Sequence, residues 1–310
     1  MGYAVVLGEA LVDLLDGEYD GQPGYRQAIG GGPLNVAVAV ARLGGDVQFV
    51  GSLGDDALAE RIRAFLTAAG VGLAGAVTVP APTALAVATF AGPEPDFRFY
   101  GEPRSYAQLT PDDLDVALVE GADVLYCGSI VLLDPPVLAA ARRAWAIAGA
   151  LRVFDPNVRP RLLTGPDALD GLRGVVAEFA ASAHLVKLSS ADARVLYPDE
   201  PVEGVAAYLR ELGAATVVVT LGADGALVAA ADDVVRVPAP KVDAVDATGA
   251  GDSVMGALIA DLLASGEPAE PTGWRDRVAF ALRVAALVCE SPGGATAMPT
   301  RPAVRSRFPT

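Results

Sequence analysis

The chain has 310 residues, which is long enough to bury a large core as one big α/β domain or as two smaller ones. Hydrophobic residues make up 52% of it, and this excludes disorder as the main state of the chain. Its formal net charge of −15 disfavours a nucleic-acid partner, because binding to a phosphate backbone needs a basic surface. An acidic protein can still bind a nucleotide through a local site of backbone amides, metal ions and a few cations.

The N-terminus and the two cysteines show no sign of secretion or of a metal site. The chain begins MGYAVVLGEALVDLL, with no basic leader and with acids already at Glu9 and Asp13, which is typical of a first strand. No uncharged apolar stretch is long enough to span a bilayer. Cys127 and Cys289 each lie in an apolar run, where we expect buried free thiols. We therefore expect a cytoplasmic protein with no membrane partner.

Short β-branched runs alternate along the chain with helical patterns. Strands are predicted at 4–8, 47–54, 124–130, 151–157, 184–189 and 216–222, and helices at 56–70, 135–149 and 203–213. Apolar strands that alternate with helices indicate an α/β fold, in which a mostly parallel sheet is covered by helices on both faces.

Two stretches, 13–31 and 83–102, break this rhythm. They alternate apolar and polar residues around Gly/Pro turns, which is typical of antiparallel hairpins. Small strands inserted into an α/β core can form a lid that excludes water from an active site. We predict a single domain over residues 1–310, with an antiparallel β lid built from about 13–29 and 83–103. Ordinary edge strands are the alternative interpretation.

The segment DATGAGD at 246–252 is the most informative stretch of the chain. Small residues at Gly249, Ala250 and Gly251 precede an apolar helical pattern, so a glycine-rich turn opens a helix there. The unpaired N–H groups of that turn would lie at the positive end of the helix dipole and suit a transferring phosphoryl group. Asp252 lies at the start of the helix, where it could be a catalytic base or only an N-cap.

Other nucleotide and nucleophile motifs are absent from the sequence. It contains no GxxxxGK[ST] loop, no strand-coupled GxGxxG and no GxSxG elbow. The only histidine, His184, lies at the entry to a predicted strand, and we interpret it as structural. Hydrolase and dehydrogenase functions therefore lack their necessary residues.

Two long motifs in this order resemble the ribokinase-like (PfkB) family of carbohydrate kinases. Residues 246–258 are similar to the family's C-terminal motif, whose final aspartate is the base, and residues 30–71 are similar to its N-terminal motif. The likeness extends from about Tyr3 to Thr300. It implies a ribokinase-like fold and an ATP-dependent kinase that uses Mg²⁺, with Asp252 as the base.

The resemblance also implies an acceptor site near the N-terminus of the chain. Gly30, Gly31 and Gly32 would let the backbone approach a ligand closely. Asn35 can both donate to and accept from sugar hydroxyls, and Asp13 matches the family's hydroxyl-binding acid. Taken alone, Asn35 and Asp13 could equally be solvated polar groups.

Nucleotide contacts are implied by two further segments. VVVTLGADGALV at 217–228 resembles the family's T-x-G-x-x-G, and VKLSSAD at 186–192 stands where many members have N-x-x-E. The residues placed beside ATP by this resemblance are Thr220, Gly222, Gly225, Gly251, Lys187, Ser189 and Asp192. With Ser and Asp at these positions, Asp192 could still act on Mg²⁺ through water.

Several pieces of the sequence resemble the fructokinase branch. These are YCGSIVL, K-x-S-x-x-D and FDPNVRP, where Arg159 could pair with a phosphate oxygen. The predicted lid run at 97–109 departs from that branch, because Gly101 stands where fructokinases have arginine. Arg98 or Arg104 could reach the same space. A keto-deoxy sugar acid, ribose or a nucleoside therefore stays open as the acceptor.

A monovalent-cation site is implied near the C-terminus. SPGGATAMPT at 291–300 resembles the loop that binds such a cation, for example K⁺, in many relatives. The matching positions are Asp246, Thr248, Gly293 and Ala297, and the last stands where some relatives have serine.

The predicted function is transfer of the γ-phosphoryl group of MgATP to a primary hydroxyl, with fructose as the first choice of acceptor. A 2-keto-3-deoxygluconate kinase, a ribokinase and a nucleoside kinase are the alternatives within the family. A sugar- or nucleotide-binding regulator on the same scaffold is the alternative from another class. Exposed lid strands could also pair between subunits and form a homodimer.

Overall fold

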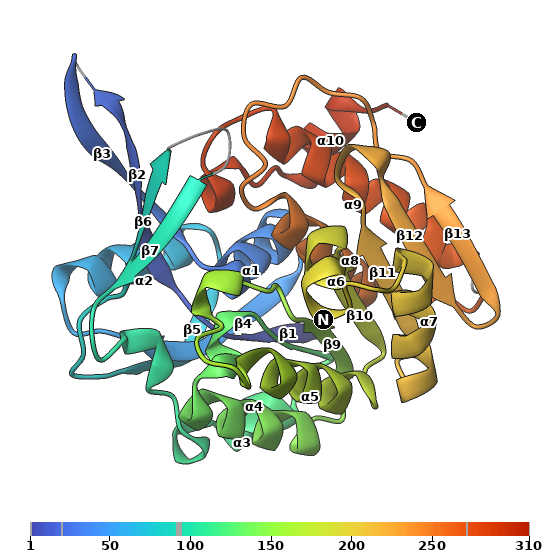
Figure 1. Cartoon of the computed structure of the whole chain (residues 1–310), viewed down its shortest axis with the longest axis horizontal. Helices are drawn as coiled ribbons and strands as arrows, with labels where there is room; N and C mark the ends of the chain where they lie inside the picture. The colour runs from blue at the N-terminus through green and yellow to red at the C-terminus, as the bar shows by residue number, and fades with distance from the viewer. Residues whose placement is uncertain (1, 20, 91–94, 271, 310) are drawn as a thin grey trace.

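The computed structural model describes residues 2–19, 21–90, 95–270 and 272–309. A nine-stranded sheet runs through the molecule in the order β13-β12-β11-β10-β9-β8-β1-β4-β5 (Figure 1). Its strands are β1 Tyr3–Leu7, β4 Asp46–Leu53, β5 Gly72–Thr78, β8 Val124–Gly128, β9 Leu151–Asp155, β10 Leu185–Ser189, β11 Thr216–Thr220, β12 Ala226–Ala230 and β13 Asp233–Val237. All neighbouring pairs from β5 to β11 are parallel, and only β12 and β13 are antiparallel to their neighbours. The prediction of a mostly parallel sheet is confirmed.

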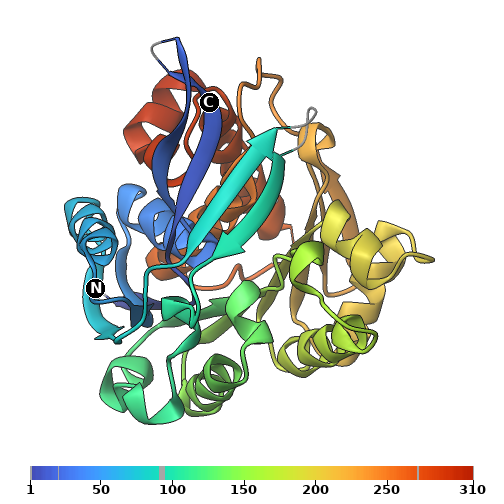
Figure 2. The same ribbon diagram turned by 60° about the vertical axis from the view of Figure 1, so that its left-hand side comes forward.

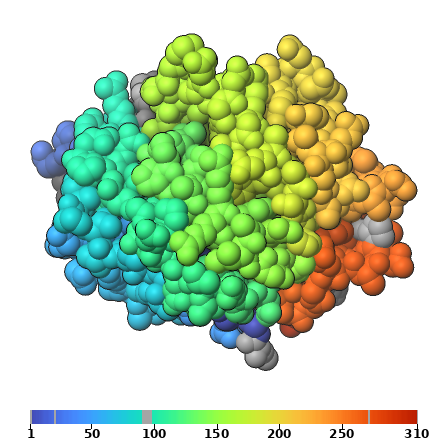
Figure 3. Space-filling model, turned by 90° about the horizontal axis from the view of Figure 1, so that it is seen from below, coloured from blue at the N-terminus to red at the C-terminus, as the bar shows by residue number. Residues whose placement is uncertain are grey.

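Helices cover both faces of this sheet because its central strands are apolar on both sides. In β1, Ala4 and Val6 pack into one buried cluster, and Val5 and Leu7 pack into the other. The first cluster is covered by α1 Gly32–Arg42, α2 Ala57–Ala68, α8 Ala250–Ser265, α9 Gly273–Cys289 and α10 Arg301–Arg307. The second is covered by α3 Val116–Glu120, α4 Pro135–Ile147, α5 Ala168–Ala180, α6 Ser190–Leu196 and α7 Val202–Leu212. Figure 3, seen from below, shows green residues of the α3–α5 layer as the surface on that side.

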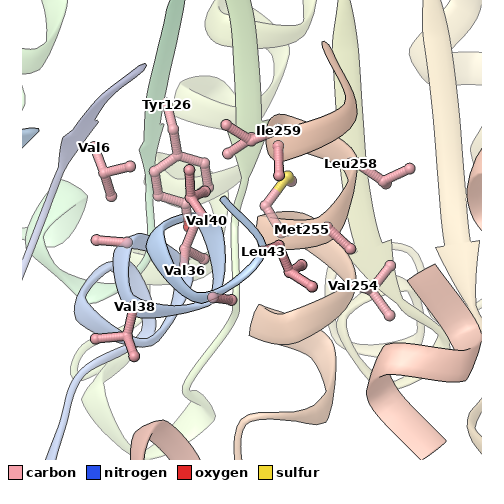
Figure 4. Close-up of a cluster of buried hydrophobic side chains, with 14 of the residues drawn as sticks. Val6, Val36, Val38, Val40, Leu43, Tyr126, Val254, Met255, Leu258 and Ile259 are labelled. Carbon is pink, nitrogen blue, oxygen red and sulfur yellow. The ribbon is translucent and has the colours of Figure 1, made fainter. Parts of the chain in front are cut away.

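The close packing of α1 against α8 sets the position of both helix starts. Val36 of α1 lies in the same buried cluster as Val254 and Met255 of α8 (Figure 4). A Cβ on Gly256 would overlap the Ala39 side chain and come within 2.9 Å of the Val36 carbonyl oxygen. Glycine therefore permits an approach that no other residue allows. Because the two helices touch here, their N-terminal turns meet at the edge of the large sheet.

A second, four-stranded sheet has the order β3-β2-β6-β7 and projects from the large sheet (Figures 1 and 2). It comprises β2 Leu11–Tyr19, β3 Gln22–Gly30, β6 Leu85–Phe90 and β7 Pro95–Tyr100. The β2–β3 and β6–β7 pairs are antiparallel hairpins, as predicted. The two hairpins are joined through β2 and β6, which form a parallel pair within the small sheet. Whether this sheet moves as a lid, and whether the whole chain acts as one domain, stay predictions.

The two cysteines differ in their burial. Cys127 is fully buried in β8, and burial raises the pKa of its thiol. Cys289 ends α9 and is half-buried, so the prediction of a buried thiol is wrong there. Among the described residues, no helix is both long and apolar enough to cross a membrane.

Candidate active site

A cavity of about 330 Å³ lies where the carboxyl ends of β1, β8 and β9 meet the starts of α1 and α8. The small sheet supplies one wall of this cavity through residues of β2, β6 and β7. Open α/β sheets bind ligands at the carboxyl ends of their strands, and this volume lies at the lower end of the range for ligand pockets. The lining residues are Glu9, Leu11, Asp13, Gly31, Gly32, Asn35, Ala86, Phe99, Ile130, Asn157, Arg159, Ala247, Thr248, Gly249, Gly251 and Asp252.

Asp252 is the third residue of α8, and its carboxylate is held by two side-chain amides. Its Oδ2 accepts a hydrogen bond from Asn35 Nδ2 at 2.8 Å, and its Oδ1 accepts one from Asn157 Nδ2 at 3.3 Å. Gly249 occupies the N-cap position in a left-handed conformation with φ of 77°, and no side chain caps the helix. The interpretation of Asp252 as an N-cap is therefore wrong. The side chain faces the cavity and keeps lone pairs for a further donor.

The charge on Asp252 depends on Lys187. Burial raises the pKa of Asp252, while the charge of Lys187 and the amide of Asn35 oppose that rise. Lys187 is itself 3% exposed and pairs with Asp155 at 2.6 Å. Its Nζ also lies beside the first turn of α8, because a Cβ on Gly251 would stand 3.2 Å from it. A carboxylate with a raised pKa and a cation nearby is suited to accept a proton near neutral pH.

Lys187 and Asp155 each favour the charged form of the other. Burial raises the pKa of Asp155 to about 6, against the opposing charge of Lys187. Burial also opposes the charge on Lys187, but the carboxylates of Asp155 and Asp252 outweigh it and raise its pKa. One positive charge therefore serves two carboxylates, of which Asp252 lines the cavity.

The glycine-rich turn before Asp252 offers fewer free donors than the sequence suggests. The N–H of Ala250 donates to the carbonyl of Ala247 at 3.1 Å, and Ala250 does not line the cavity. A direct role of Ala250 in the reaction stays a prediction. The N–H groups of Gly251 and Asp252 belong to the first helical turn, where no partner within the helix exists. These two groups remain as the candidate anion site, with Gly249 shaping the turn.

The predicted acceptor residues gather at the wall formed by β2 and the start of α1. Asp13, Gly31, Gly32 and Asn35 all line the cavity. A Cβ on Gly32 would stand 2.5 Å from Asn157 Nδ2, so glycine leaves room for the amide that contacts Asp252. Burial raises the pKa of Asp13 to about 7, against the opposing charge of Arg159.

Gly30 lies behind these residues and does not line the cavity. A Cβ there would overlap Asp13 Oδ2, so Gly30 makes room for the Asp13 carboxylate and does not itself face a ligand. Its contact with the substrate stays a prediction.

Glu9 is a cavity residue that sequence reasoning missed. It is 2% exposed, and its Oε1 accepts from Ser129 Oγ at 2.6 Å and from Gly32 N at 3.1 Å. None of the described residues bonds its Oε2, and burial raises its pKa to about 7. The only signal in the sequence is its position, directly after an apolar strand that ends at the ligand-binding edge of the sheet.

The three arginines predicted at the acceptor site line two different cavities. Arg159 lines the cavity, and its Nη1 donates to Asn157 Oδ1 at 2.7 Å, which turns the Asn157 amide nitrogen toward Asp252. Arg98 and Arg104 instead line a neighbouring cavity of about 590 Å³. These two arginines do not line the cavity at Asp252, which shares only Phe99 and Ile130 with theirs, and their place in the acceptor site stays a prediction.

Comparison with known proteins places this geometry in a family. The model of the pfkB family carbohydrate kinases matches residues 1–301. The chain belongs to the pfkB family of carbohydrate kinases. It is 36% identical to fructokinase-1 of Zea mays over 290 residues, covering 90% of this chain and 87% of that protein. It is 35% identical to the aminoimidazole riboside kinase of Salmonella typhimurium, covering 82% and 79% of the two chains.

A solved structure from the same family has nearly the same fold. Fructokinase from Vibrio cholerae O395, in its fructose, ADP and calcium ion bound form, superposes with a TM-score of 0.88 at 29% identity. The match covers 99% of this chain and 98% of that one. The predicted ribokinase-like fold and carbohydrate-kinase family are confirmed.

The residues that the family resemblance assigns to ATP lie at the ends of β10 and β11. Thr220 ends β11, and Gly222 follows with φ of 62° and open space where a Cβ would stand. A ligand could therefore approach the backbone at Gly222. Gly225 has a different reason to be glycine, because a Cβ there would overlap the carbonyl oxygen of Val237.

Ser189 and Asp192 form a capping box at the start of α6. Ser189 Oγ accepts from Asp192 N at 3.0 Å, and Asp192 Oδ2 accepts from Ser189 N at 2.8 Å. Asp192 Oδ1 accepts from Val158 N at 2.9 Å. This carboxylate therefore anchors α6 and the segment after β9. Among the residues that the structure describes, no three His, Cys, Asp or Glu side chains gather into a metal site.

The predicted cation loop is brought together around one carboxylate. Asp246 Oδ1 accepts from Thr248 N at 2.8 Å, and its Oδ2 accepts from Gly293 N at 3.1 Å. Burial opposes the charge of Asp246, but these hydrogen bonds outweigh it and lower its pKa. Ala297 ends the adjoining 3₁₀ turn, Gly294–Ala297. Binding of a monovalent cation there stays a prediction.

Proposed function

We propose that this pfkB-family chain is an ATP-dependent sugar kinase that phosphorylates a primary hydroxyl of fructose. The observation that carries the proposal is the buried carboxylate of Asp252, which faces the cavity between two amide donors at the N-terminus of α8. A protein that only bound its ligand would have no need of a base in that position. The similarity to fructokinases over nine-tenths of the chain supports fructose as the acceptor.

The reaction begins when the acceptor lies against Asp13 and Asn35 with its primary hydroxyl directed at Asp252. As that oxygen attacks the γ-phosphorus of ATP, its proton passes to the carboxylate of Asp252 and ADP leaves with the bridging oxygen. The N–H groups of Gly251 and Asp252 stabilise the charge on the phosphoryl oxygens. Lys187, beside Gly251, adds a positive charge at the same end of the helix.

The donor set at the nucleotide end does not suit a dedicated Mg²⁺ cage. Asp192, the acid closest to the family's metal-organising position, already bonds Ser189 and Val158. Mg²⁺ usually keeps several waters and is held largely by substrate phosphates, and it would neutralise part of their charge when bound with ATP. Thr220, Gly222 and Gly225 remain the proposed neighbours of the nucleotide.

Aminoimidazole riboside is the second candidate acceptor. The similarity to the kinase for that riboside is almost as high as the similarity to fructokinase-1, at 35% against 36% identity. Both compounds present a primary hydroxyl on a five-membered sugar ring, so the same base and hydroxyl-binding acid could serve either.

An ADP-release assay with MgATP separates these proposals. The acceptors to compare are fructose, aminoimidazole riboside, ribose, 2-keto-3-deoxygluconate and adenosine, each with the wild type and with Asp252→Asn. We expect the highest kcat/KM with fructose. A higher value with another acceptor would replace fructose, and no turnover with any acceptor would favour a non-catalytic binding protein.

The predicted homodimer remains a proposal. In the described chain, β3 and β7 are the outer strands of the small sheet and have neighbours on one side only. Tyr25 and Tyr100 on these strands are 54% and 52% exposed. Strands of this kind can pair with a second subunit.

A further inference from the structure

Two hollows of about 640 and 720 Å³ lie next to each other along α9 and α10. Both are bordered by Asp276, Ala279, Arg283, Phe308 and Pro309, so the two hollows adjoin, and together they are called one cleft below. We name it the arginine cleft after the five arginines that line it, which are Arg275, Arg283, Arg301, Arg305 and Arg307. None of its lining residues also lines the cavity at Asp252. It is therefore a separate site.

The charge of the arginine cleft is opposite to that of the molecule. Five arginines and a single acid, Asp276, line it, whereas the chain as a whole carries a formal charge of −15. Arg307 pairs with Glu290 at 2.6 Å. No hydrogen bond or ion pair within the described part of the chain involves the guanidinium groups of Arg275, Arg283 or Arg305. Like charges brought together without partners repel one another, so this cluster favours an anion between them.

Two of the guanidinium groups are held in place by aromatic rings. The Arg301 guanidinium lies 4.8 Å from the centre of the Phe280 ring, and its Nε donates to the Leu43 carbonyl at 3.3 Å. The Arg307 guanidinium lies 4.9 Å from the centre of the Phe308 ring. Stacking restricts the plane of a guanidinium. Arg307 already donates from Nε and Nη2 to Glu290, whereas Arg301 uses only its Nε within the described chain. Part of the cleft is thus ordered before any ligand arrives, which lowers the entropic cost of binding.

We propose that the arginine cleft binds a small polyphosphate, either inorganic or the tail of a nucleotide. Guanidinium groups pair with phosphate oxygens through two parallel hydrogen bonds. Several of them in one cleft need several negative charges within a short length, which a polyphosphate chain supplies and a single phosphate does not. Two hollows, each of a size usual for small-ligand pockets, favour a small ligand over a flat protein partner.

Isothermal titration calorimetry of the full chain with inorganic tripolyphosphate tests the proposal. Arg283→Gln and Arg305→Gln each remove one unpaired cation from the cleft, and each should weaken binding about tenfold or more, as the loss of a charged hydrogen bond does. Arg142→Gln is the matched control, because it removes the same charge from α4 on the opposite side of the molecule (Figure 1). The control should bind as the wild type does, and orthophosphate at equal ionic strength should bind much more weakly.

Titration with ATP distinguishes the two sources of the polyphosphate. A nucleotide tail in the cleft would give two ATP sites per wild-type chain, and the affinity of one of them should fall about tenfold or more in Arg305→Gln. An inorganic ligand would give one ATP site in the wild type and one in Arg305→Gln. The variant would still bind tripolyphosphate more weakly than the wild type does. Arg305 is exposed, so its replacement should leave the fold intact even if replacement of half-buried Arg283 does not.

Three results would overturn the proposal. The first is a wild-type chain that binds no tripolyphosphate, and the second is equal weakening by Arg142→Gln, which would mean general charge attraction only. The third is unchanged binding in both cleft variants, which would place the probe elsewhere, for example at the nucleotide end of the active site. A wild-type dimer that Arg283→Gln dissociates, in the absence of tripolyphosphate binding, would instead assign the cleft to a second copy of the chain. ADP release with fructose tests the kinase proposal independently of all these outcomes.

Discussion

The buried carboxyl of Glu9 makes the stability of this protein depend on pH in a way that one substitution can isolate. Its pKa is 4.5 in the unfolded reference and about 7 in the folded chain, because burial disfavours the charge. A raised pKa means that the folded state holds the proton more tightly. The contribution of Glu9 to stability is therefore fully present below about pH 4.5 and is lost as the pH rises through about 7. A rise of about 2.5 in pKa corresponds to about 3 kcal/mol, and most of that is lost between about pH 5 and 8.

Glu9→Gln keeps the shape of the side chain and removes its titration. The amide oxygen can still accept from Ser129 and Gly32, whereas its NH₂ would occupy the place where Oε2 has no partner among the described residues. The cost of that buried NH₂ does not depend on pH, so it drops out when one compares two pH values. Relative to the wild type, the variant should gain about 2–3 kcal/mol in free energy of unfolding between about pH 5 and pH 8.

Urea unfolding monitored by the fluorescence of the buried Trp145 and Trp274 measures this difference. Glu120→Gln, at an exposed position in α3, is the control and should follow the wild type at both pH values. If the free energy of unfolding of Glu9→Gln depends on pH as that of the wild type does, then the pKa of Glu9 does not rise on folding as stated above. The reasoning from burial would then be refuted.

Three further substitutions test the site itself. Asp252→Asn removes the base, and kcat in the ADP-release assay should fall about 10²–10⁴-fold; wild-type turnover would contradict the assignment. Lys187→Met leaves a buried aspartate unpaired and should cost about 3–5 kcal/mol in urea unfolding. It should also move the acidic limb of the pH–rate profile to higher pH, since Lys187 holds the pKa of Asp252 down. An unmoved limb would show that Lys187 does not lower the pKa of Asp252. Gly32→Ala would place a Cβ 2.5 Å from Asn157 Nδ2. It should lower kcat/KM about 10–100-fold, whereas Gly174→Ala, which meets open space, should not.

The features that sequence could predict are those carried by local pattern. Alternation of apolar strands and amphipathic helices predicts the large sheet, and each predicted strand overlaps an observed one. The small residues of 249–251 before an apolar helix place Asp252 in the first turn of α8, because a helix start is a local event. The N-terminal motif predicts a second helix start at the same edge of the sheet. Asn35 lies at that helix start and contacts Asp252.

The features that sequence could not predict depend on contacts between distant segments. Whether β2 pairs with β6 in a parallel or antiparallel sense is decided by where the two hairpins leave the large sheet, which no pattern within either hairpin records. Arg98 is the sequence neighbour of Phe99, which lines the cavity, yet Arg98 and Arg104 line only the neighbouring cavity. In the sequence Glu9 is one more acid near the N-terminus. Its burial and its hydrogen bond with Ser129 depend on the fold.

The distribution of charge in the cavity bears on which acceptor it can take. Burial raises the pKa of Glu9, of Asp13 and of Asp252, so the acceptor wall is rich in carboxyl groups that already resist ionisation. Of the three arginines that could have served an acidic substrate, only Arg159 lines the cavity, and its Nη1 is bonded to Asn157. A carboxylate on the acceptor would add a fourth acid to a wall that has one lining cation, Arg159, among the described residues, and it would raise the pKa values of these acids further. A neutral polyol can instead donate its hydroxyl protons to the same carboxyl groups. The site therefore favours fructose over a keto-deoxy sugar acid.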